Sequence, residues 1–184
     1  MPFPNPVPQI FPENLLTGVL PGGEERRWWV VHTKARQEKA IARNLLAQSI
    51  PYFAPQTEKT TLVRGRKRRS FVPVFSGYVF LYGSESERYR SLTTNRVAQV
   101  IKVDDQQQLR QDLACVWRMI ESKVPLTVEG RLAAGKLVRV RSGVLAGIEG
   151  VVMERRAKCR LLVAVHMLQQ GVSVAIDDFM LEPI

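Results

Sequence analysis

A phosphate-binding loop is the first chemistry that residue spacing suggests in this chain. Gly130, Gly135 and Lys136 satisfy the spacing G-x-x-x-x-G-K, in which backbone N–H groups and a lysine cradle phosphate. Such a loop continues with a Ser or Thr that reaches magnesium, and with a helix whose N-terminus faces the phosphate. Leu137 stands in the Ser or Thr position, and the residues after it alternate like a strand. This mismatch argues against nucleotide binding.

The residues that commonly carry catalysis or metal binding are few and scattered. His32 and His166 lie in separate strand-like segments, and no Ser-His-Asp order, nucleophile elbow or H-E-x-x-H motif occurs. Cys115 and Cys159 lie far apart and neither belongs to a C-x-x-C pair. A disulfide framework or a thiolate zinc site is therefore not expected, and a reducing compartment fits. We predict a protein that is not an enzyme and that uses no cofactor and no metal.

The sharpest charge feature is "RGRKRR", residues 64–69, with five cations in six positions. A hairpin tip could carry these side chains to phosphates, where each neutralised phosphate releases counterions and makes binding salt-dependent. A merely solvated tip is the alternative, because charge runs usually face water. The whole chain has 27 Lys and Arg against 17 Asp and Glu, a net charge of +10. Such an excess favours acidic partners, most commonly nucleic acid.

Aromatic residues gather in the segment "PVFSGYVFLY". Strand alternation sends Tyr78, Phe80 and Tyr82 to one face and Val79 and Leu81 to the other. Three interpretations remain open: both faces are core, one face is a protein-docking patch, or the rings stack on unpaired bases.

Local patterns predict the elements that position these residues. "RWWVVH" and "GYVFLYG" are typical of strands, and "VAQVIKV" alternates like an antiparallel strand. "KARQEKAIARNLLAQ" has helical spacing, with Thr33 as its N-cap and Pro51 as its end. "TEKTTLVRGRKRRSFVPVF" is typical of a hairpin whose tip is Arg64-Gly65-Arg66.

Two further helices complete the first half of the chain. Ser84 and Glu87 make a capping box for a short helix. A longer amphipathic helix follows Asp104 or Asp105. The order β-α-β-β-β-α-β-α predicts an α+β domain, in which helices flank an antiparallel four-stranded sheet.

The amino-acid composition changes from Lys123 onward. "KVPLTVEGRLAAG" has the proline, glycines and small residues of a linker. In the next stretch, "GKLVRVRSGVLAGIEGVV", alternation predicts a curled hairpin. Gly143 and Gly147 bracket a tight connection, and Gly150 inside the returning strand marks a bulge, a sharp bend or a close backbone approach. Short strand-like segments favour a small barrel, since closure removes exposed edges. These segments are Leu137–Arg141, Ile148–Met153, Arg160–His166, Val172–Ile176 and Phe179–Leu181.

The N-terminus, "MPFPNPVPQIFPENLLTGVLPGG", holds six of the eleven prolines. Repeated proline predicts an extended, flexible leader with little internal hydrogen bonding. Docking of a partner through Ile10, Phe11 and Leu15 is the alternative. The leader has no basic n-region of a secretion signal, and no apolar run approaches the ~20 residues that span a membrane.

These segments resemble a known family. "WWVVHTKARQEKAIARNL", "YFAP", "RGRKRR", "PVFSGYVFL" and "RVAQVIKV" resemble the N-terminal NGN domain of NusG-family transcription elongation factors. "GKLVRVRSGVLAGIEGVV" resembles their C-terminal KOW motif. The hairpin tip and the segment from Pro73 to Phe80 are more similar to specialised paralogues of the RfaH, LoaP and UpxY kind. The resemblance implies a leader (1–25), an NGN domain (26–122), a linker (123–131) and a small all-β, SH3-like KOW barrel (132–184).

The resemblance also implies a function. The protein would be a transcription elongation or antitermination factor that binds the clamp of RNA polymerase through its NGN domain and favours processive elongation. Its KOW domain would recruit a ribosomal protein, the termination factor Rho, or RNA, and DNA or nascent RNA would contact the NGN domain. We expect a cytoplasmic monomer with no membrane association. A ribosomal-type KOW protein that binds RNA without polymerase is the alternative, against which the NGN-like domain argues.

The family pattern assigns residues to three sites. Those in or beside the polymerase-binding surface are Trp29, Tyr52, Phe53, Pro55, Phe75, Tyr78, Phe80, Thr93 and Thr94. Those facing nucleic acid are Lys34, Arg36, Gln37, Arg64, Arg66, Lys67, Arg68 and Arg69. Those of the KOW motif are Gly135, Val138, Val140, Gly143, Gly147 and Gly150.

Some paralogues keep the KOW segment helical until DNA releases it. Here that segment is rich in valine and alternates, so we predict a barrel. Only Ala157–Gln170, "AKCRLLVAVHMLQQ", has modest helical potential.

Overall fold

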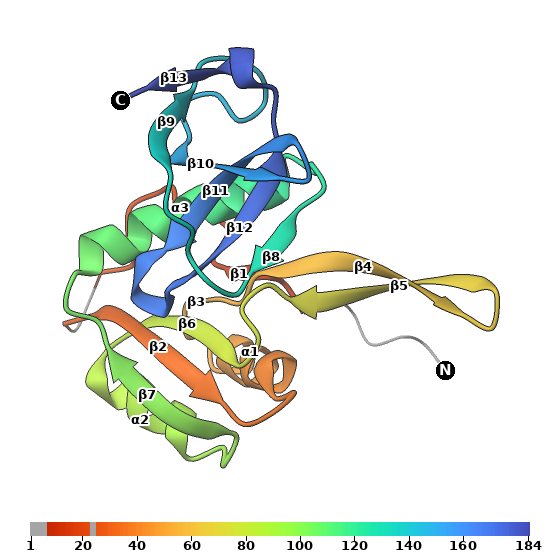
Figure 1. Ribbon diagram of the computed structural model, residues 1–184. Helices are drawn as coiled ribbons and strands as arrows, with labels where there is room; N and C mark the ends of the chain where they lie inside the picture. The colour runs from red at the N-terminus through yellow and green to blue at the C-terminus, as the bar shows by residue number, and fades with distance from the viewer. Residues whose placement is uncertain (1–6, 23–24) are drawn as a thin grey trace. The chain divides into compact units, whose positions relative to one another are not determined.

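The computed structural model describes residues 7–22 and 25–184, with the backbone alone for Phe179 (Figure 1). Residues 1–6, 23 and 24 of the expected leader lie outside the described residues. The chain forms two compact units, Met1–Gln106 and Gln107–Ile184. The first unit is α+β, and antiparallel strands dominate the second.

A five-stranded antiparallel sheet, in the order β1-β3-β6-β2-β7, forms the centre of the first unit. Its strands are β1 (Ile10–Phe11), β2 (Arg27–Thr33), β3 (Tyr52–Phe53), β6 (Tyr78–Gly83) and β7 (Val97–Lys102). The two apolar runs "RWWVVH" and "GYVFLYG" become the neighbours β2 and β6, with Val31 opposite Val79. The predicted α+β class is confirmed, and β1 extends the expected four-stranded sheet.

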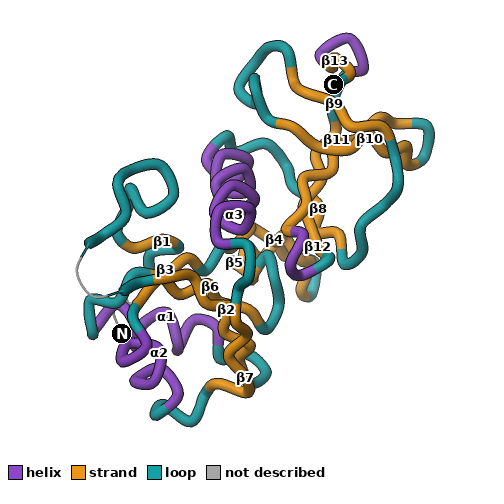
Figure 2. Tube along the Cα trace, turned by 90° about the vertical axis from the view of Figure 1, so that its left-hand side faces the viewer, coloured by secondary structure: helices purple, strands orange, loops and turns teal. Residues whose placement is uncertain are grey.

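Helices α1 (Glu38–Ala47) and α2 (Glu85–Leu92) lie side by side in this unit (Figure 2). Ile41 and Leu45 of α1 are fully buried in one apolar cluster with side chains of β2, β3 and β6. Burial of each such side chain stabilises the fold by roughly 1.5–3 kcal/mol. This cluster holds α1 against the sheet.

The two helix starts differ in how well local signals predicted them. The Ser84–Glu87 capping box is confirmed: the Ser84 hydroxyl accepts from the Glu87 N–H at 3.3 Å, and the Glu87 carboxylate accepts from the Ser84 N–H at 2.8 Å. The prediction of Thr33 as the N-cap of α1 was wrong. Thr33 belongs to β2, and α1 begins only after Gln37, whose side chain makes no capping bond. The loop between them is needed to turn the chain from the sheet into the helix.

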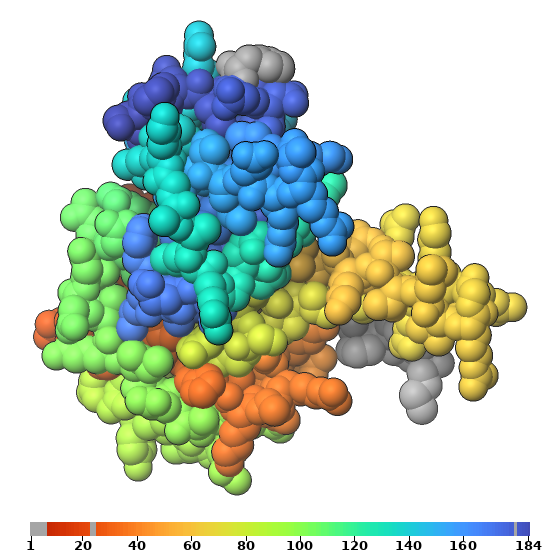
Figure 3. Space-filling model, in the orientation of Figure 1, coloured from red at the N-terminus to blue at the C-terminus, as the bar shows by residue number. Residues whose placement is uncertain are grey.

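Strands β4 (Gln56–Val63) and β5 (Arg66–Pro73) form a separate two-stranded sheet, the predicted hairpin. Arg64 and Gly65 connect them with φ of 49° and 76°. Positive φ at both central residues is the type I′ arrangement, whose twist matches that of the flanking strands. The hairpin projects from the rest of the first unit (Figures 1 and 3). Its tip therefore reaches into solvent.

The described part of the leader is not the extended, flexible tail that its prolines predicted. β1 pairs with β3 at the edge of the sheet, with Ile10 opposite Phe53. The Ala54 N–H donates to the Gln9 carbonyl at 2.7 Å. Ile10 and the following turn residue Leu15 are buried. Residues 7–22 thus contain an integral edge of the first unit, because apolar side chains between the prolines find partners in the sheet.

The second unit contains a six-stranded antiparallel sheet in the order β13-β9-β10-β11-β12-β8. Its strands are β8 (Thr127–Glu129), β9 (Lys136–Val140), β10 (Glu149–Arg155), β11 (Lys158–Val165), β12 (Gln170–Ala175) and β13 (Leu181–Pro183). The strand pairs of the described chain form an open series, without a β13–β8 pair, so a closed barrel is not shown.

Two 3₁₀ turns, His166–Leu168 and Asp178–Met180, flank β12. The strand prediction is confirmed for most of the segment with helical potential, because Lys158–Val165 forms β11. It was wrong only at His166, the expected last residue of that strand, which instead begins the first 3₁₀ turn before the chain returns as β12.

β8 lies inside the segment that was expected to be a linker. Its Glu129 is buried and accepts a hydrogen bond from the Ser173 hydroxyl of β12 at 2.6 Å. Arg155 approaches the same carboxylate at 3.4 Å. A buried carboxylate needs such partners, so residues 127–129 are fixed to the sheet. The proline and glycines around β8 are typical of a linker, and they obscured the pattern of a strand that is only three residues long.

Helix α3 (Gln106–Glu121) begins at the last residue of the first unit. The Gln106 side chain accepts from the Trp28 N–H at 2.6 Å and donates to the Trp28 carbonyl at 3.0 Å. Within the second unit, buried Asp112 accepts from the His166 N–H at 3.0 Å, and Arg118 donates to the Ala146 carbonyl at 2.7 Å. These bonds fasten α3 to two loops of the second sheet.

Candidate functional site

The aromatic residues assigned to the polymerase surface are mostly core residues in this structure. Tyr78 is half-buried, whereas the other ring residues and the accompanying proline are buried: Trp29, Tyr52, Phe53, Pro55, Phe75 and Phe80. Trp29 and Tyr52 belong to the cluster around α1. Of the three interpretations left open for the aromatic segment, packing in the core therefore describes these buried side chains. The central strands β2 and β6 are buried on both faces, and alternation along a strand does not reveal whether a face is covered.

A second group of rings packs on the other side of the sheet from that cluster. Phe53 and Phe80 have ring centroids 6.2 Å apart, and Phe75 meets Phe80 edge-on at 5.9 Å. Trp28 and Tyr82 lie 5.3 Å apart. Such contacts add roughly 0.5–1.5 kcal/mol per pair beyond burial. These rings therefore stabilise the sheet that presents Tyr78.

Tyr78 is the one predicted aromatic contact residue with substantial exposed surface among the described residues. Its ring stacks on His32, with centroids 5.0 Å apart and planes 21° apart. The preceding Gly77 has φ of 83°, and its N–H donates to the Glu38 carboxylate at 2.7 Å. Gly77 thus turns the chain into β6 and fixes the position of Tyr78. His32 serves as a stacking partner here, which explains its place without a catalytic role.

The two predicted threonines end helix α2. The Thr93 hydroxyl donates to the Arg90 carbonyl at 2.7 Å, and the Thr94 hydroxyl donates to the Ser91 carbonyl at 2.8 Å. Thr93 is exposed and Thr94 is half-buried. Both hydroxyls satisfy carbonyls of the last helical turn, which otherwise lack intrahelical partners. The surface that they offer to a partner is mainly that of Thr93.

Lys34 and Gln37 belong to a cluster that sequence reasoning found only in part. The Lys34 ammonium donates to the Asn95 side chain at 2.8 Å, and the Arg96 guanidinium donates to the Gln37 side chain at 2.6 Å. With Arg36, these five residues form what we call the loop cluster. Arg36 and Asn95 have φ of 60° and 55°.

Asn95 and Arg96 were missed because they lie about sixty residues from their partners in the chain. An Asn-Arg pair between a helix and a strand was the available signal, since Asn tolerates left-handed backbone. The loop cluster adds three cations, Lys34, Arg36 and Arg96, all exposed. This arrangement can bind phosphate without first losing a buried partner.

The predicted cations of the hairpin are all exposed: Arg64, Arg66, Lys67, Arg68 and Arg69. Arg69 pairs with Glu58 at 3.2 Å, with both side chains well exposed. Water screens such a pair, so it contributes little stability and is easily exchanged for phosphate. The Lys39 ammonium of α1 donates to the Phe71 carbonyl at 2.8 Å and so anchors the base of the hairpin. The hairpin is thus a supported, cationic projection.

The glycine motif of the second unit has a structural basis. Gly143 and Gly147 have φ of 86° and 83° and bracket the turn between β9 and β10. A Cβ on Gly150 would lie 2.5 Å from the Leu162 carbonyl oxygen, so β10 and β11 approach closely there. The remaining members are the tightly placed Gly135 and the buried Val138 and Val140. These residues shape the sheet rather than offer contacts.

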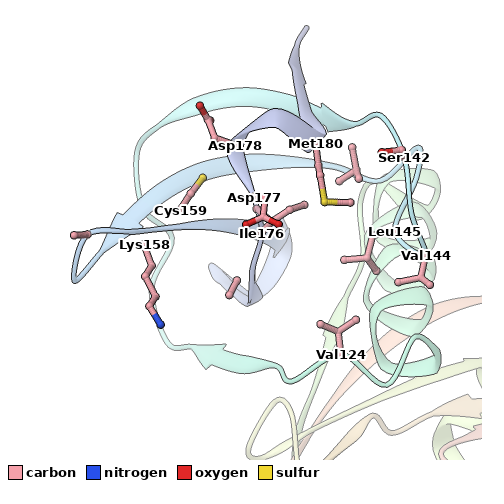
Figure 4. Close-up of a pocket in the computed structure, with 13 residues that line it drawn as sticks. Val124, Ser142, Val144, Leu145, Lys158, Cys159, Ile176, Asp177, Asp178 and Met180 are labelled. Atoms are coloured by element: carbon pink, nitrogen blue, oxygen red, sulfur yellow. The ribbon is translucent and has the colours of Figure 1, made fainter.

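A pocket of about 580 Å³ opens in the second unit (Figure 4). Its apolar lining includes Val140 of β9 and Leu145 of the β9–β10 loop. Ile176, which follows β12, and Met180 of the second 3₁₀ turn complete it. Its polar lining consists of Ser142, Lys158, Cys159, Asp177 and Asp178. Partial burial raises the pKa of the Cys159 thiol, and the Asp178 and Glu154 carboxylates raise it further. The thiol therefore stays protonated at neutral pH.

No group of three or more His, Cys, Asp or Glu side chains in residues 7–22 and 25–184 could hold a metal ion. In the same part of the chain, no helix is both long and apolar enough to cross a membrane.

Comparison with known proteins gives a family match. The sequence model of the family described as "Transcription termination factor nusG" matches residues 26–131, which is more than half of the chain. A search of curated proteins gives no match. Members of the matched family are non-enzymatic, and the family implies RNA polymerase binding. The match covers β2–β7, α1–α3, the loop cluster and the cationic hairpin. The chain belongs to the NusG family of transcription factors.

Proposed function

We propose that this protein is an elongation or antitermination factor of the specialised RfaH, LoaP and UpxY kind, acting as a cytoplasmic monomer. Its NGN domain binds the clamp of RNA polymerase and favours processive elongation, and its second unit acts as the KOW domain, with an SH3-like barrel as its working fold. The observation that carries the proposal is the family match over residues 26–131, which contain every exposed cation assigned to nucleic acid.

The polymerase contact centres on Tyr78, with Thr93 and Thr94 at the end of α2 as further contacts. Tyr78 supplies apolar surface, whose burial is worth about 25 cal/mol per Å². The buried rings around it keep the sheet rigid, so that little conformational entropy is lost on docking. They act as support and not as contacts.

Nucleic acid contacts the loop cluster and the hairpin. Each phosphate that these cations neutralise lowers the slope of log affinity against log salt by about 0.9 for duplex DNA. Arginine predominates in the hairpin, and its planar fork binds phosphate through several donors at once. The exposed cations thus add a salt-sensitive grip to the polymerase contact.

The second unit recruits a protein, either a ribosomal protein or Rho. Its pocket is lined mainly by aliphatic side chains and could accept an apolar side chain of a partner. Asp177 and Asp178 stand in the same lining and would repel RNA phosphates. The pocket therefore supports a protein partner better than RNA.

The mechanism requires only binding. A protein that holds the polymerase clamp and nearby nucleic acid together stabilises the conformation in which both sites are presented. That conformation is the closed, elongating one. A contact with equal affinity for both conformations would bind without shifting the polymerase between them.

Direct binding to core RNA polymerase at low ionic strength tests the proposal. We expect the purified chain to co-elute with polymerase and to raise transcript length past pause and termination sites. Capture of ribosomal subunits without polymerase would instead support the ribosomal-type alternative and overturn the proposal. Absence of polymerase binding would overturn it as well.

A further inference from the structure

The outermost strand of the second sheet, β8, covers only part of its neighbour β12 (Figure 1). It pairs with Gly171–Ser173, three of the six residues of β12. Residues 122–126 before β8 and residues 130–135 after it lie outside helices and strands. A strand this short makes few backbone bonds, and irregular chain on both sides allows it to leave the edge by local opening.

Three side chains of neighbouring strands bind β8. Arg160 of β11 donates to the Thr127 hydroxyl at 2.8 Å. The Glu129 carboxylate accepts from the Ser173 hydroxyl of β12 at 2.6 Å, and Arg155 of β10 lies 3.4 Å from it. We call Arg155, Arg160 and Ser173, with the outer edge of β12, the strand site. Because all of these groups belong to β10, β11 and β12, the strand site is complete without β8.

The bonds of β8 show which side chains the strand site selects. Thr127 and Glu129 lie two residues apart, so they point to the same face of the sheet. Val128 points to the other face and is 40% exposed. A hydroxyl thus meets one arginine, and a carboxylate meets a second arginine and a buried hydroxyl. Charge-assisted bonds of this kind are stronger than neutral ones. The strand site therefore suits an extended segment with a hydroxyl side chain and a carboxylate two residues later.

We propose that β8 is an internal cover of the strand site, and that an extended protein segment with this hydroxyl and carboxylate spacing replaces it. The inference rests on the proposed role of the second unit in recruiting a protein, and it adds a control on that recruitment. An added edge strand gains affinity from main-chain hydrogen bonds and specificity from its side chains. A partner strand that pairs with all six residues of β12 makes more such bonds than β8, which pairs with three.

The cover raises the affinity that a partner needs. Because β8 belongs to the same chain, its effective concentration at the strand site is roughly millimolar, as for short flexible connections. The apparent affinity of a free segment is reduced by the fraction of chains in which β8 has left. The Arg155 side chain is 54% exposed, so an arriving carboxylate can reach it while Glu129 is still in place. Arg155 is therefore where the exchange of strands begins.

Fluorescence anisotropy with the full chain tests the inference. The probe is a labelled synthetic peptide of residues 124–131, "VPLTVEGR". Thr127→Ala with Glu129→Ala, the cover variant, removes the bonds that hold β8 and keeps the strand site. The cover variant should bind the peptide at least about tenfold more tightly than wild type does. A peptide with Gln in place of its glutamate should bind the cover variant at least about tenfold more weakly, because it loses charge-assisted bonds.

Two further variants control this comparison. Arg155→Gln in the cover variant should remove most of the gain in peptide affinity, since it takes away one partner of the carboxylate. Val128→Ala is the matched control, because this side chain lies in β8 but points away from the strand site, and its peptide affinity should equal that of wild type. If the cover variant does not fold, the wild-type chain at high peptide concentration carries the test. Its weaker binding should still require the peptide glutamate and Arg155.

Equal peptide affinity in wild type and a folded cover variant would overturn the inference. Dimerisation of the wild-type chain that Glu129→Ala abolishes would overturn the assignment to another protein, because β8 of a second copy would then be the occupant. Capture of ribosomal subunits or Rho by the full chain separates the two proposals. If wild type captures either of them and the peptide binds neither chain, recruitment stands and the cover inference falls. If the peptide binds as expected and neither is captured, the proposed recruitment falls.

Discussion

The phenol of Tyr52 in β3 donates a hydrogen bond to the Pro8 carbonyl, with an oxygen–oxygen distance of 2.8 Å. Phe11 stacks on the same ring, with centroids 6.4 Å apart. β3 is only two residues long, and β1 is its outer neighbour in the sheet. These contacts join the N-terminal segment to a domain whose family match begins at residue 26. The segment is therefore part of the first unit's packing.

The buried phenol gives unfolding a pH dependence above neutrality. Burial raises the pKa of Tyr52 from 10.0 to about 12, so the folded state favours the protonated phenol. The contribution of the buried phenol to the free energy of unfolding is fully present below pH 10. It is lost as pH rises to about 12, because the unfolded chain releases the phenol proton at a lower pH than the folded chain does. Tyr52→Phe lacks this loss. It should be about 1 kcal/mol less stable than wild type at neutral pH, with the difference narrowing as pH rises through this window.

Urea unfolding of wild type and Tyr52→Phe across that window measures the effect. Tyr89→Phe is the control, because Tyr89 is exposed. This variant should keep the pH dependence of unfolding that wild type shows. Parallel stability curves for wild type and Tyr52→Phe would contradict the assignment.

A cavity in the N-terminal segment should destabilise the first unit. Leu15 is fully buried, so Leu15→Ala should cost about 2–5 kcal/mol of unfolding free energy. Val19 lies in the same segment but is 91% exposed, and Val19→Ala should change stability by less than about 0.5 kcal/mol. Thermal or urea unfolding compares the pair. Equal stability of the two variants would show that the segment does not pack as described.

Local signals predicted the elements whose geometry adjacent residues determine. The hairpin tip follows from Arg64 and Gly65, and the start of α2 follows from Ser84 and Glu87. A glycine inside a strand predicted a bulge, a sharp bend or a close backbone approach at Gly150, and the structure shows the close approach. In each of these cases the deciding contacts lie within one hairpin or one helical turn.

Features that depend on distant residues were missed. Alternation assigned Phe80 to a face, but burial of that face depends on tertiary packing. The loop cluster joins Lys34 to Asn95, and no local pattern connects residues so far apart. The N-terminal strand was missed because proline content dominated its interpretation. Gln9 and Ile10 between the prolines still offered the backbone groups and apolar surface that an edge strand needs.

Replacement of Tyr78 and of Phe75 should separate surface from core. Tyr78→Ala should weaken polymerase binding with little loss of stability, because Tyr78 is half-buried and stacks on His32. Phe75→Ala should instead cost about 3–5 kcal/mol of stability, since Phe75 is fully buried against Phe80. Polymerase binding by size-exclusion co-elution and urea unfolding give the two readouts. Full polymerase affinity in Tyr78→Ala would place the contact surface elsewhere.

Neutralising the hairpin should flatten the salt dependence of binding to duplex DNA or to DNA-loaded polymerase. Gln in place of Arg66, Lys67, Arg68 and Arg69 should reduce the slope by about 0.9 for each phosphate that the hairpin no longer neutralises. The matched control neutralises four exposed cations of the second unit, Arg131, Lys136, Arg156 and Lys158. The control should keep the slope of wild type. If the hairpin variant also keeps the salt slope of wild type, the cations of residues 64–69 form only a solvated tip.

The close approach of β10 and β11 predicts that two glycines of the second unit differ in how well they tolerate replacement by alanine. A Cβ at Gly150 would meet the Leu162 carbonyl oxygen at 2.5 Å and the Leu161 side chain at 3.0 Å, so Gly150→Ala must push two strands apart. Overpacking of this kind costs about 1–3 kcal/mol. Gly130 has open space around the same position, and Gly130→Ala should be neutral or slightly stabilising. Urea unfolding distinguishes them, and equal stability would mean that the strands do not approach as closely as this sheet requires.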